Sequence, residues 1–202
     1  MYGTSESIYE TLDELYAAGK TAEVEEFLLT ALIMNQPCCG KMNSAYITVL
    51  YELGVYFRRV GKLLRSLDWF VLLRGIIYDH LGPDSFEYAV VIENMASTFE
   101  KAGEYDKALH YYLQTLQIYK HKAGVQNSRY LEVLENVCRL YEAQKDYKAA
   151  MIYHANLLSL LNCRDAGQEN SRLAELCKMA GLKDKTKVYV HKYDVPPKKN
   201  LN

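Results

Sequence analysis

The sequence predicts an all-α protein built from repeated pairs of antiparallel helices. The 202 residues include only 11 Gly and 4 Pro, too few for the many turns that separate the short strands of a β-sandwich or barrel. Glycines also recur every 42 residues, in one series at Gly19, Gly61 and Gly103 and in a second at Gly40, Gly82 and Gly124. A fixed period of this length is typical of helical repeat proteins.

Each 42-residue unit is expected to contain two helices, each ended by a glycine. In the third unit, apolar residues recur at helical spacing before Gly103 and again before Gly124. A glycine directly after the last apolar residue is typical of a left-handed C-cap, and Ser85 is a suitable N-cap for the helix that follows Gly82. The predicted helix pairs are 5–18 and 21–36, 43–60 and 63–81, 85–102 and 105–123, and 127–144 and 147–162, followed by a single helix at 169–181.

Small residues are expected where the two helices of a pair approach each other. Equivalent repeat positions hold Gly54, Ala96 and Cys138 on the first helices and Ser66, Ala108 and Ala150 on the second. Because one hairpin cannot bury its own apolar face, the hairpins are expected to stack into one core. We therefore predict a solenoid over residues 1–182, with repeats at about 4–42, 43–84, 85–126 and 127–168, a capping helix at about 169–181, and a basic tail at 183–202.

The units resemble the tetratricopeptide repeat (TPR), in the 42-residue variety of kinesin light chains. The third unit, YAVVIENMASTFEKAGEYDKALHYYLQTLQIYKHKAG, carries the resemblance best, and the fourth is similar. The resemblance covers roughly residues 5–166 and is strongest over 46–166. It departs from the pattern in the first pair and at Glu52, which stands where the later units have Asn94 and Asn136. The resemblance implies a right-handed α-solenoid, the TPR superhelix, whose concave groove binds a peptide or helix of a partner protein.

Carried over position by position, the resemblance implies a concave face formed by the first helix of each pair. Its residues are Thr48, Tyr51, Val55, Arg58 and Arg59, then Val90, Glu93, Asn94, Ser97, Glu100 and Lys101, then Glu132, Glu135, Asn136, Arg139 and Glu142. We expect a groove that is basic toward Arg58 and Arg59 and acidic toward Glu132, Glu135 and Glu142, with a partner of reverse polarity. Two alternatives stay open: the charges form only a solvated surface, and the asparagines bond a neighbouring helix rather than a peptide.

Composition and motifs exclude several classes of function and partner. The formal charge of -1, from 24 basic and 25 acidic residues, disfavours a nucleic-acid partner. The longest apolar stretch, Trp69 to Tyr78, contains Arg74 and is too short to span a membrane. We expect a cytoplasmic protein, because no secretory signal is visible and the five cysteines suit reduced thiols better than a disulfide framework. With no catalytic motif and no metal-ligand spacing, we expect neither an enzyme nor a cofactor or metal site.

The sequence therefore predicts a non-enzymatic adaptor or scaffold for a protein or peptide partner. The alternative is a structural module that forms a homodimer through the first hairpin or the final helix, or a regulatory segment of a larger signalling protein. The segment 183–202 carries six Lys and two Asp, and it either lies against an acidic solenoid surface or serves as a linker.

Overall fold

The computed structural model describes residues 4–37, 43–161 and 166–181, and within these ranges the chain forms nine helices and no strand. The predicted helices are confirmed, with ends displaced by three residues or fewer. The helices are α1 (Ser5–Ala17), α2 (Thr21–Met34), α3 (Ser44–Arg59), α4 (Leu63–Leu81), α5 (Phe86–Lys101), α6 (Tyr105–Lys122), α7 (Ser128–Ala143), α8 (Tyr147–Leu160) and α9 (Ala166–Met179). The predicted tail at 183–202 lies outside the described residues, as does Gly40.

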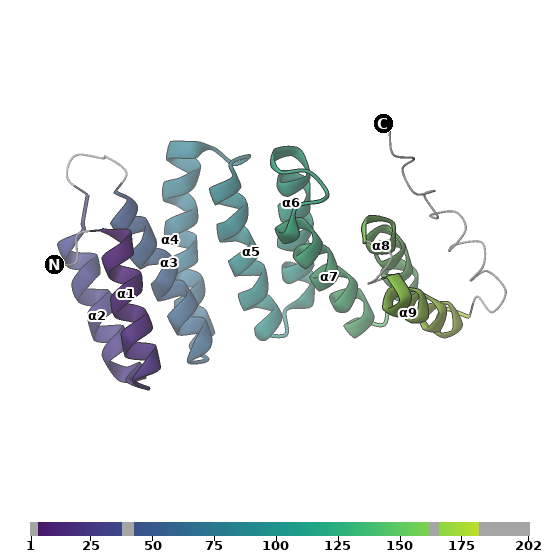
Figure 1. Cartoon of the computed structure of the whole chain (residues 1–202), viewed down its shortest axis with the longest axis horizontal. Coiled ribbons are helices and arrows are strands. Elements are labelled where there is room, and N and C mark those ends of the chain that lie inside the picture. Colours follow the sequence, from purple (N-terminus) through teal and green to yellow (C-terminus); the bar gives the residue numbers. More distant parts are fainter. Residues whose placement is uncertain (1–3, 38–42, 162–165, 182–202) are drawn as a thin grey trace, which may run out of the picture. The chain divides into compact units, whose positions relative to one another are not determined.

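The chain divides into two compact units, residues 1–111 and residues 112–202, and the division falls within α6. We call the first helix of each pair helix A (α1, α3, α5, α7) and the second helix B (α2, α4, α6, α8). In the first unit, the helices α1 to α5 lie side by side (Figure 1), and α3 contacts α1, α2, α4 and α5. In the second unit, α8 packs against both α7 and α9.

Backbone caps repeat with the same 42-residue period as the sequence. The second residue after helix A, which follows the C-cap, has a positive φ in every pair: Gly19 (69°), Gly61 (78°), Gly103 (76°) and Lys145 (61°). Since this left-handed conformation is costly for a residue with a Cβ, Lys145 shows that the sharp reversal is imposed by the repeat rather than by glycine alone. The N-caps of α3, α5 and α7 are Asn43, Ser85 and Asn127, also 42 residues apart, and each side chain accepts a hydrogen bond from a backbone N–H of its helix.

Helices α3 and α4 approach each other closely at Gly54. A Cβ on Gly54 would meet the ring of buried Phe70 at 2.6 Å, so only glycine fits at this distance. On the facing helix, the Ser66 hydroxyl donates to the Gly54 carbonyl oxygen at 2.7 Å. The small residues predicted for the other pairs, Ala96, Ala108, Cys138 and Ala150, are all buried.

A buried polar contact then connects this pair to α5. Ser66 and Thr98 are both fully buried, and their hydroxyl oxygens are 3.4 Å apart. Thr98 Oγ1 donates to the Asn94 carbonyl oxygen at 2.8 Å. Because Ser66 and Thr98 each have a backbone acceptor, neither buried hydroxyl is left unsatisfied.

Each unit has its own apolar core. In the first unit, one cluster of buried residues joins α1, α2 and α3, with Ile8, Val24, Leu28, Val49 and Leu53 fully buried. The core of the second unit joins α8 to α9. Its buried members are Ala150, Met151, Ala155, Leu173, Leu176 and Cys177. The final helix therefore buries an apolar face against α8.

The two helical glycines of α3 and α4 give a matched test of this packing. We expect Gly54→Ala to lower the free energy of unfolding by about 1–3 kcal/mol, because the added methyl displaces the Phe70 ring. Gly75→Ala is expected to raise it by about 0.5–1 kcal/mol, since no atom lies within 4 Å of the new Cβ and alanine favours the helix. Urea unfolding of the two variants measures the difference. Equal effects of the same sign would contradict the close approach at Gly54.

Candidate functional site

The predicted concave residues of the first unit lie on α3 and α5, and they differ widely in exposure. Thr48, Val55 and Asn94 are each only 8% exposed, so they pack between helices rather than forming open surface. The Thr48 hydroxyl donates to Ser5 Oγ on α1 at 3.0 Å. Arg59 and Lys101 are exposed, and the other six residues are half-buried: Tyr51, Arg58, Val90, Glu93, Ser97 and Glu100. We call the surface formed by these residues of α3 and α5, together with residues of α1, the helix-A face of the first unit.

Asn94 links α5 to α3. Its side-chain Nδ2 donates to the Val90 carbonyl oxygen at 2.8 Å and to Tyr51 Oη at 3.3 Å. Its backbone carbonyl oxygen also accepts from Arg58 Nη1 at 3.2 Å. The sequence left open whether Asn94 contacts a bound peptide or bonds a neighbouring helix. In the structure its side chain bonds Tyr51 on the neighbouring helix α3. Arg58 is likewise engaged within the protein.

Helix α1 adds three residues to this face that sequence analysis missed. Tyr9, Asp13 and Tyr16 lie exactly one period before Tyr51, Val55 and Arg58, so the 42-residue repeat itself was the signal that identifies them. The Arg59 guanidinium lies over the Tyr16 ring, 4.9 Å from its centroid, within cation–π distance. Sequence analysis missed these residues of α1 because the first hairpin matches the repeat pattern only weakly.

Glu52 is the second omission. It lies on α3 at the repeat position of Asn94 and Asn136, and burial raises the pKa of its carboxyl, although the positive charge of Arg59 opposes this and the charge of Asp13 adds to it. The end of the face predicted to be basic, at Arg58 and Arg59, therefore also carries two carboxylates.

The helix-A face of the second unit is formed by α7. Glu132, Glu135 and Arg139 are exposed, and Asn136 is half-buried. Arg139 Nη2 donates to Asn136 Oδ1 at 2.9 Å, so this asparagine bonds a side chain of its own helix. Glu132 and Glu135 place two exposed carboxylates on this helix.

Glu142, the last predicted residue, belongs to a polar cluster that joins α7, α8 and α9. Its Oε1 is 2.6 Å from His154 Nε2 and 3.1 Å from Arg172 Nε, and Arg172 Nη2 bonds its other oxygen. Burial alone would raise the pKa of Glu142, but the bonds from Arg172 and His154 outweigh it and lower the pKa. Its charge is thus compensated inside the protein.

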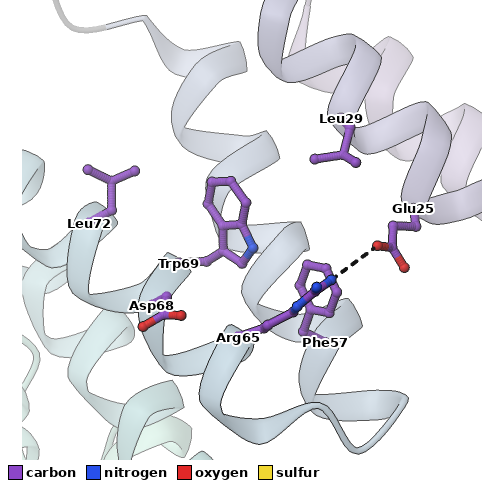
Figure 2. Close-up of a pocket in the computed structure, with 7 residues that line it drawn as sticks. All are labelled: Glu25, Leu29, Phe57, Arg65, Asp68, Trp69 and Leu72. Carbon is purple, nitrogen blue, oxygen red and sulfur yellow. Dashed lines mark ion pairs between the residues drawn. The ribbon is translucent and has the colours of Figure 1, made fainter.

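A pocket of about 350 Å³ lies on the other side of the first unit, between α2 and α4 (Figure 2). Leu29, Trp69 and Leu72 form its apolar walls, and Arg65 reaches across it to Glu25, with 3.7 Å between Nη1 and Oε1. Leu29 and Leu72 are 38% and 44% exposed. This is an apolar surface on helices B, which sequence analysis did not identify.

The described ranges contain no group of three His, Cys, Asp or Glu side chains that could hold a metal ion. None of the helices described is long and apolar enough to cross a membrane.

Comparison with known proteins supports the family suggested by the repeats. Residues 87–162 match the family model described as the tetratricopeptide repeat. The matched segment spans α5 to α8 and is similar to tetratricopeptide repeats. No curated protein sequence matches the chain.

Solved structures show that the TPR fold extends beyond the matched residues. BtubC (BKLC) from P. vanneervenii is similar over 98% of this chain and 84% of its own, with a TM-score of 0.76 and 20% identity. A putative kinesin light chain from Podosopora anserina, with nearly identical TPR-like repeats, is similar over 96% and 94%, with a TM-score of 0.76 and 12% identity. The fold class is therefore the all-α solenoid of antiparallel helix pairs that the sequence predicts.

The cluster around Glu142 predicts how the final helix, α9, is held. We expect Glu142→Gln to lower the free energy of unfolding at pH 7 by about 1–3 kcal/mol, because charge-assisted bonds to His154 and Arg172 are lost. Glu175→Gln is the matched control, since Glu175 bonds the same arginine at 2.6 Å but its side chain is 55% exposed, and it should cost less than about 0.5 kcal/mol. Hydrogen exchange of α9 amides locates the loss.

The same cluster is expected to make the free energy of unfolding depend on pH. Because the folded-state pKa of Glu142 is lowered, its contribution is complete above the ordinary value of 4.5 and is lost as the pH falls through the lowered value. The difference between wild type and Glu142→Gln should therefore shrink on acidification below 4.5. A difference that stays constant would contradict the ionic role of Glu142.

Proposed function

We propose that the chain is a non-catalytic adaptor that binds a peptide or helix of a partner protein on its helix-A faces. The TPR fold supports a protein-interaction adaptor or scaffold in general. The observation that carries the finer proposal is that these faces keep charged side chains of both signs accessible. These are Arg59, Lys101, Glu132, Glu135 and Arg139. Charges of both signs favour selective recognition of a complementary partner over general attraction to a polyanion.

Charge exchange on the two sides of the repeats tests this proposal. The variant Lys101→Glu with Glu132→Lys alters the helix-A faces, while Lys120→Glu with Asp79→Lys alters exposed positions of helices B in α6 and α4. Both double variants keep the net charge of the chain. Captured protein partners are quantified by mass spectrometry after incubation of each immobilised variant with host lysate.

We expect capture of the principal partners to fall about tenfold or more with the helix-A variant and to stay unchanged with the helix-B variant. Asn94→Ala is less informative, because the bonds of Asn94 to Tyr51 and Val90 also hold the fold. Equal capture by the wild type and the helix-A variant would contradict the proposal.

A second candidate function, self-association, is favoured by the exposed apolar surface of α2. Ile33 and Met34 are 70% and 64% exposed, and Leu29, one helical turn before Ile33, lines the pocket between α2 and α4. A second copy related by a two-fold axis would place its own α2 on the same surface, since such interfaces are self-complementary. The partner in this case is another copy of the chain.

Sedimentation equilibrium at micromolar concentration tests self-association. If it occurs through α2, Ile33→Glu should weaken the dimer about tenfold or more, because it buries a charge in the interface. Ile152→Glu on α8 is the control, at 59% exposure in the wild type. A monomer throughout, or equal weakening by both variants, would remove this candidate.

A further inference from the structure

A second pocket, of about 370 Å³, lies on the first hairpin, and the described residues that line it come from α1 and α2 alone. Its lining residues, which we call the α1–α2 surface, are Thr11, Leu15, Glu23, Glu26, Phe27 and Thr30. All of them except Thr11 stand 42 residues before a residue that lines the pocket between α2 and α4. The first hairpin therefore presents to solvent the same side that the second hairpin turns toward α2.

The pocket between α2 and α4 shows what lies on this side of a hairpin inside the protein. Helix α2 contributes Glu25 and Leu29 to it, one helical turn apart (Figure 2). Glu25 Oε1 lies 3.7 Å from Arg65 Nη1, and Leu29 lines the same pocket as Trp69. The second hairpin is thus met by a helix that supplies a charge opposite to its own and an aliphatic side chain on the next turn.

On the α1–α2 surface the equivalent charge is reversed. Glu23 stands one period before Arg65, and Glu26 stands one period before Asp68. Glu23 pairs with Lys20 at 3.0 Å, but both side chains are 53% exposed. Glu26 is exposed and forms no ion pair with a described residue. A helix on this surface would therefore meet two accessible carboxylates where α2 meets an arginine and an aspartate.

The charge of the whole first hairpin has the same sign. Residues 4–37 contain seven Asp or Glu residues and one Lys, a formal charge of -6, although the whole chain carries only -1. Glu25 is compensated from the second hairpin, by Lys62 at 3.3 Å and Arg65 at 3.7 Å. The remaining excess favours a basic partner and speeds its association, whereas it repels an acidic one.

The apolar part of the α1–α2 surface is incompletely covered. Leu15 is half-buried, whereas Phe57, one period later, is 2% exposed and packs in the cluster that includes residues of α2. A further helix would cover the part of Leu15 that remains accessible. Thr30 stands where the second hairpin has Leu72, so this surface is more polar than its internal counterpart. Such a mixed surface is typical of interfaces that form reversibly.

We propose that the α1–α2 surface binds a basic amphipathic helix of a partner protein. The helix lies on the first hairpin as α2 lies on the second, with a lysine or arginine facing Glu23 and Glu26 and an aliphatic residue on the next turn facing Leu15. Helix α2 of a second copy does not fit this description, because it contains three Glu and no basic residue. The α1–α2 surface shares no residue with the helix-A faces, so this inference goes beyond the proposed function.

The probe is the fluorescein-labelled peptide acetyl-AQAAKAAQLAAKAQALAA-amide, whose lysines and leucines share one helical face. It is titrated with the full chain at about 150 mM salt, where only close charges interact strongly, and binding is followed by fluorescence anisotropy. We expect saturable binding. The control peptide, with glutamate in place of both lysines, should bind at least about tenfold more weakly.

Two matched double variants locate the binding. Glu23→Gln with Glu26→Gln should weaken the lysine peptide about three- to tenfold, the effect of losing two surface ion pairs. Glu10→Gln with Asp13→Asn removes two exposed carboxylates of α1 that do not line the pocket, and it should change binding by less than about twofold. Far-UV circular dichroism checks that both variants keep the helix content of the wild type.

Three results would overturn the inference: no binding of the lysine peptide, equal binding of the two peptides, or equal weakening by the two double variants. The last would show attraction to the overall charge of the hairpin rather than to this surface. Self-association of the chain that is lost with Glu23→Gln and Glu26→Gln would assign the surface to a second copy and also contradict it. None of these results bears on the helix-A proposal, because Lys101 and Glu132 are unchanged throughout.

Discussion

The close approach of α3 and α4 at Gly54 is the constraint on which the rest of the first unit depends. With only a hydrogen on this Cα, the Phe70 ring lies against the backbone of α3, and the Ser66 hydroxyl reaches the Gly54 carbonyl. Once α3 and α4 are fixed at this distance, the contact between Ser66 and Thr98 places α5 next to them. Helix A of one pair is thereby brought beside helix A of the next, and their side chains form a shared face.

The two units use their acidic residues in different ways. In the second unit, Glu142 receives bonds from His154 and Arg172, so its charge serves to hold α9. In the first unit, Glu52 has no such donor, and the nearby Arg59 is directed to a tyrosine ring. A buried charge that receives hydrogen bonds contributes to stability, whereas one that is partly buried without them costs stability.

The helices, their caps and the small-residue positions could be predicted from sequence because each depends on local or periodic features. Lys145 is left-handed at the position where the other pairs have a glycine, so this cap depends on the repeat period and not on residue type alone. Contacts between helices were harder to predict from the sequence. They depend on side-chain rotamers and on which of several charged residues pair across 30 or more residues of sequence. The bonds from Arg58 to the Asn94 carbonyl and from Arg172 to Glu142 are of this kind. Tyr9 and Tyr16 could have been predicted from the 42-residue period, because they lie one period before Tyr51 and Arg58. They were missed because the first hairpin matches the repeat pattern only weakly.

Site-specific photocross-linking tests most directly whether partners bind the helix-A faces. A photoreactive p-benzoylphenylalanine is placed at Arg59 or Lys101 on helices A, and at Ile33 or Leu72 on helices B, all of which are exposed. We predict that the captured partner cross-links from Arg59 and Lys101 and not from Ile33 or Leu72. Cross-links to the partner from Ile33 and Leu72 alone would show that helices B form the binding surface and would contradict the proposal.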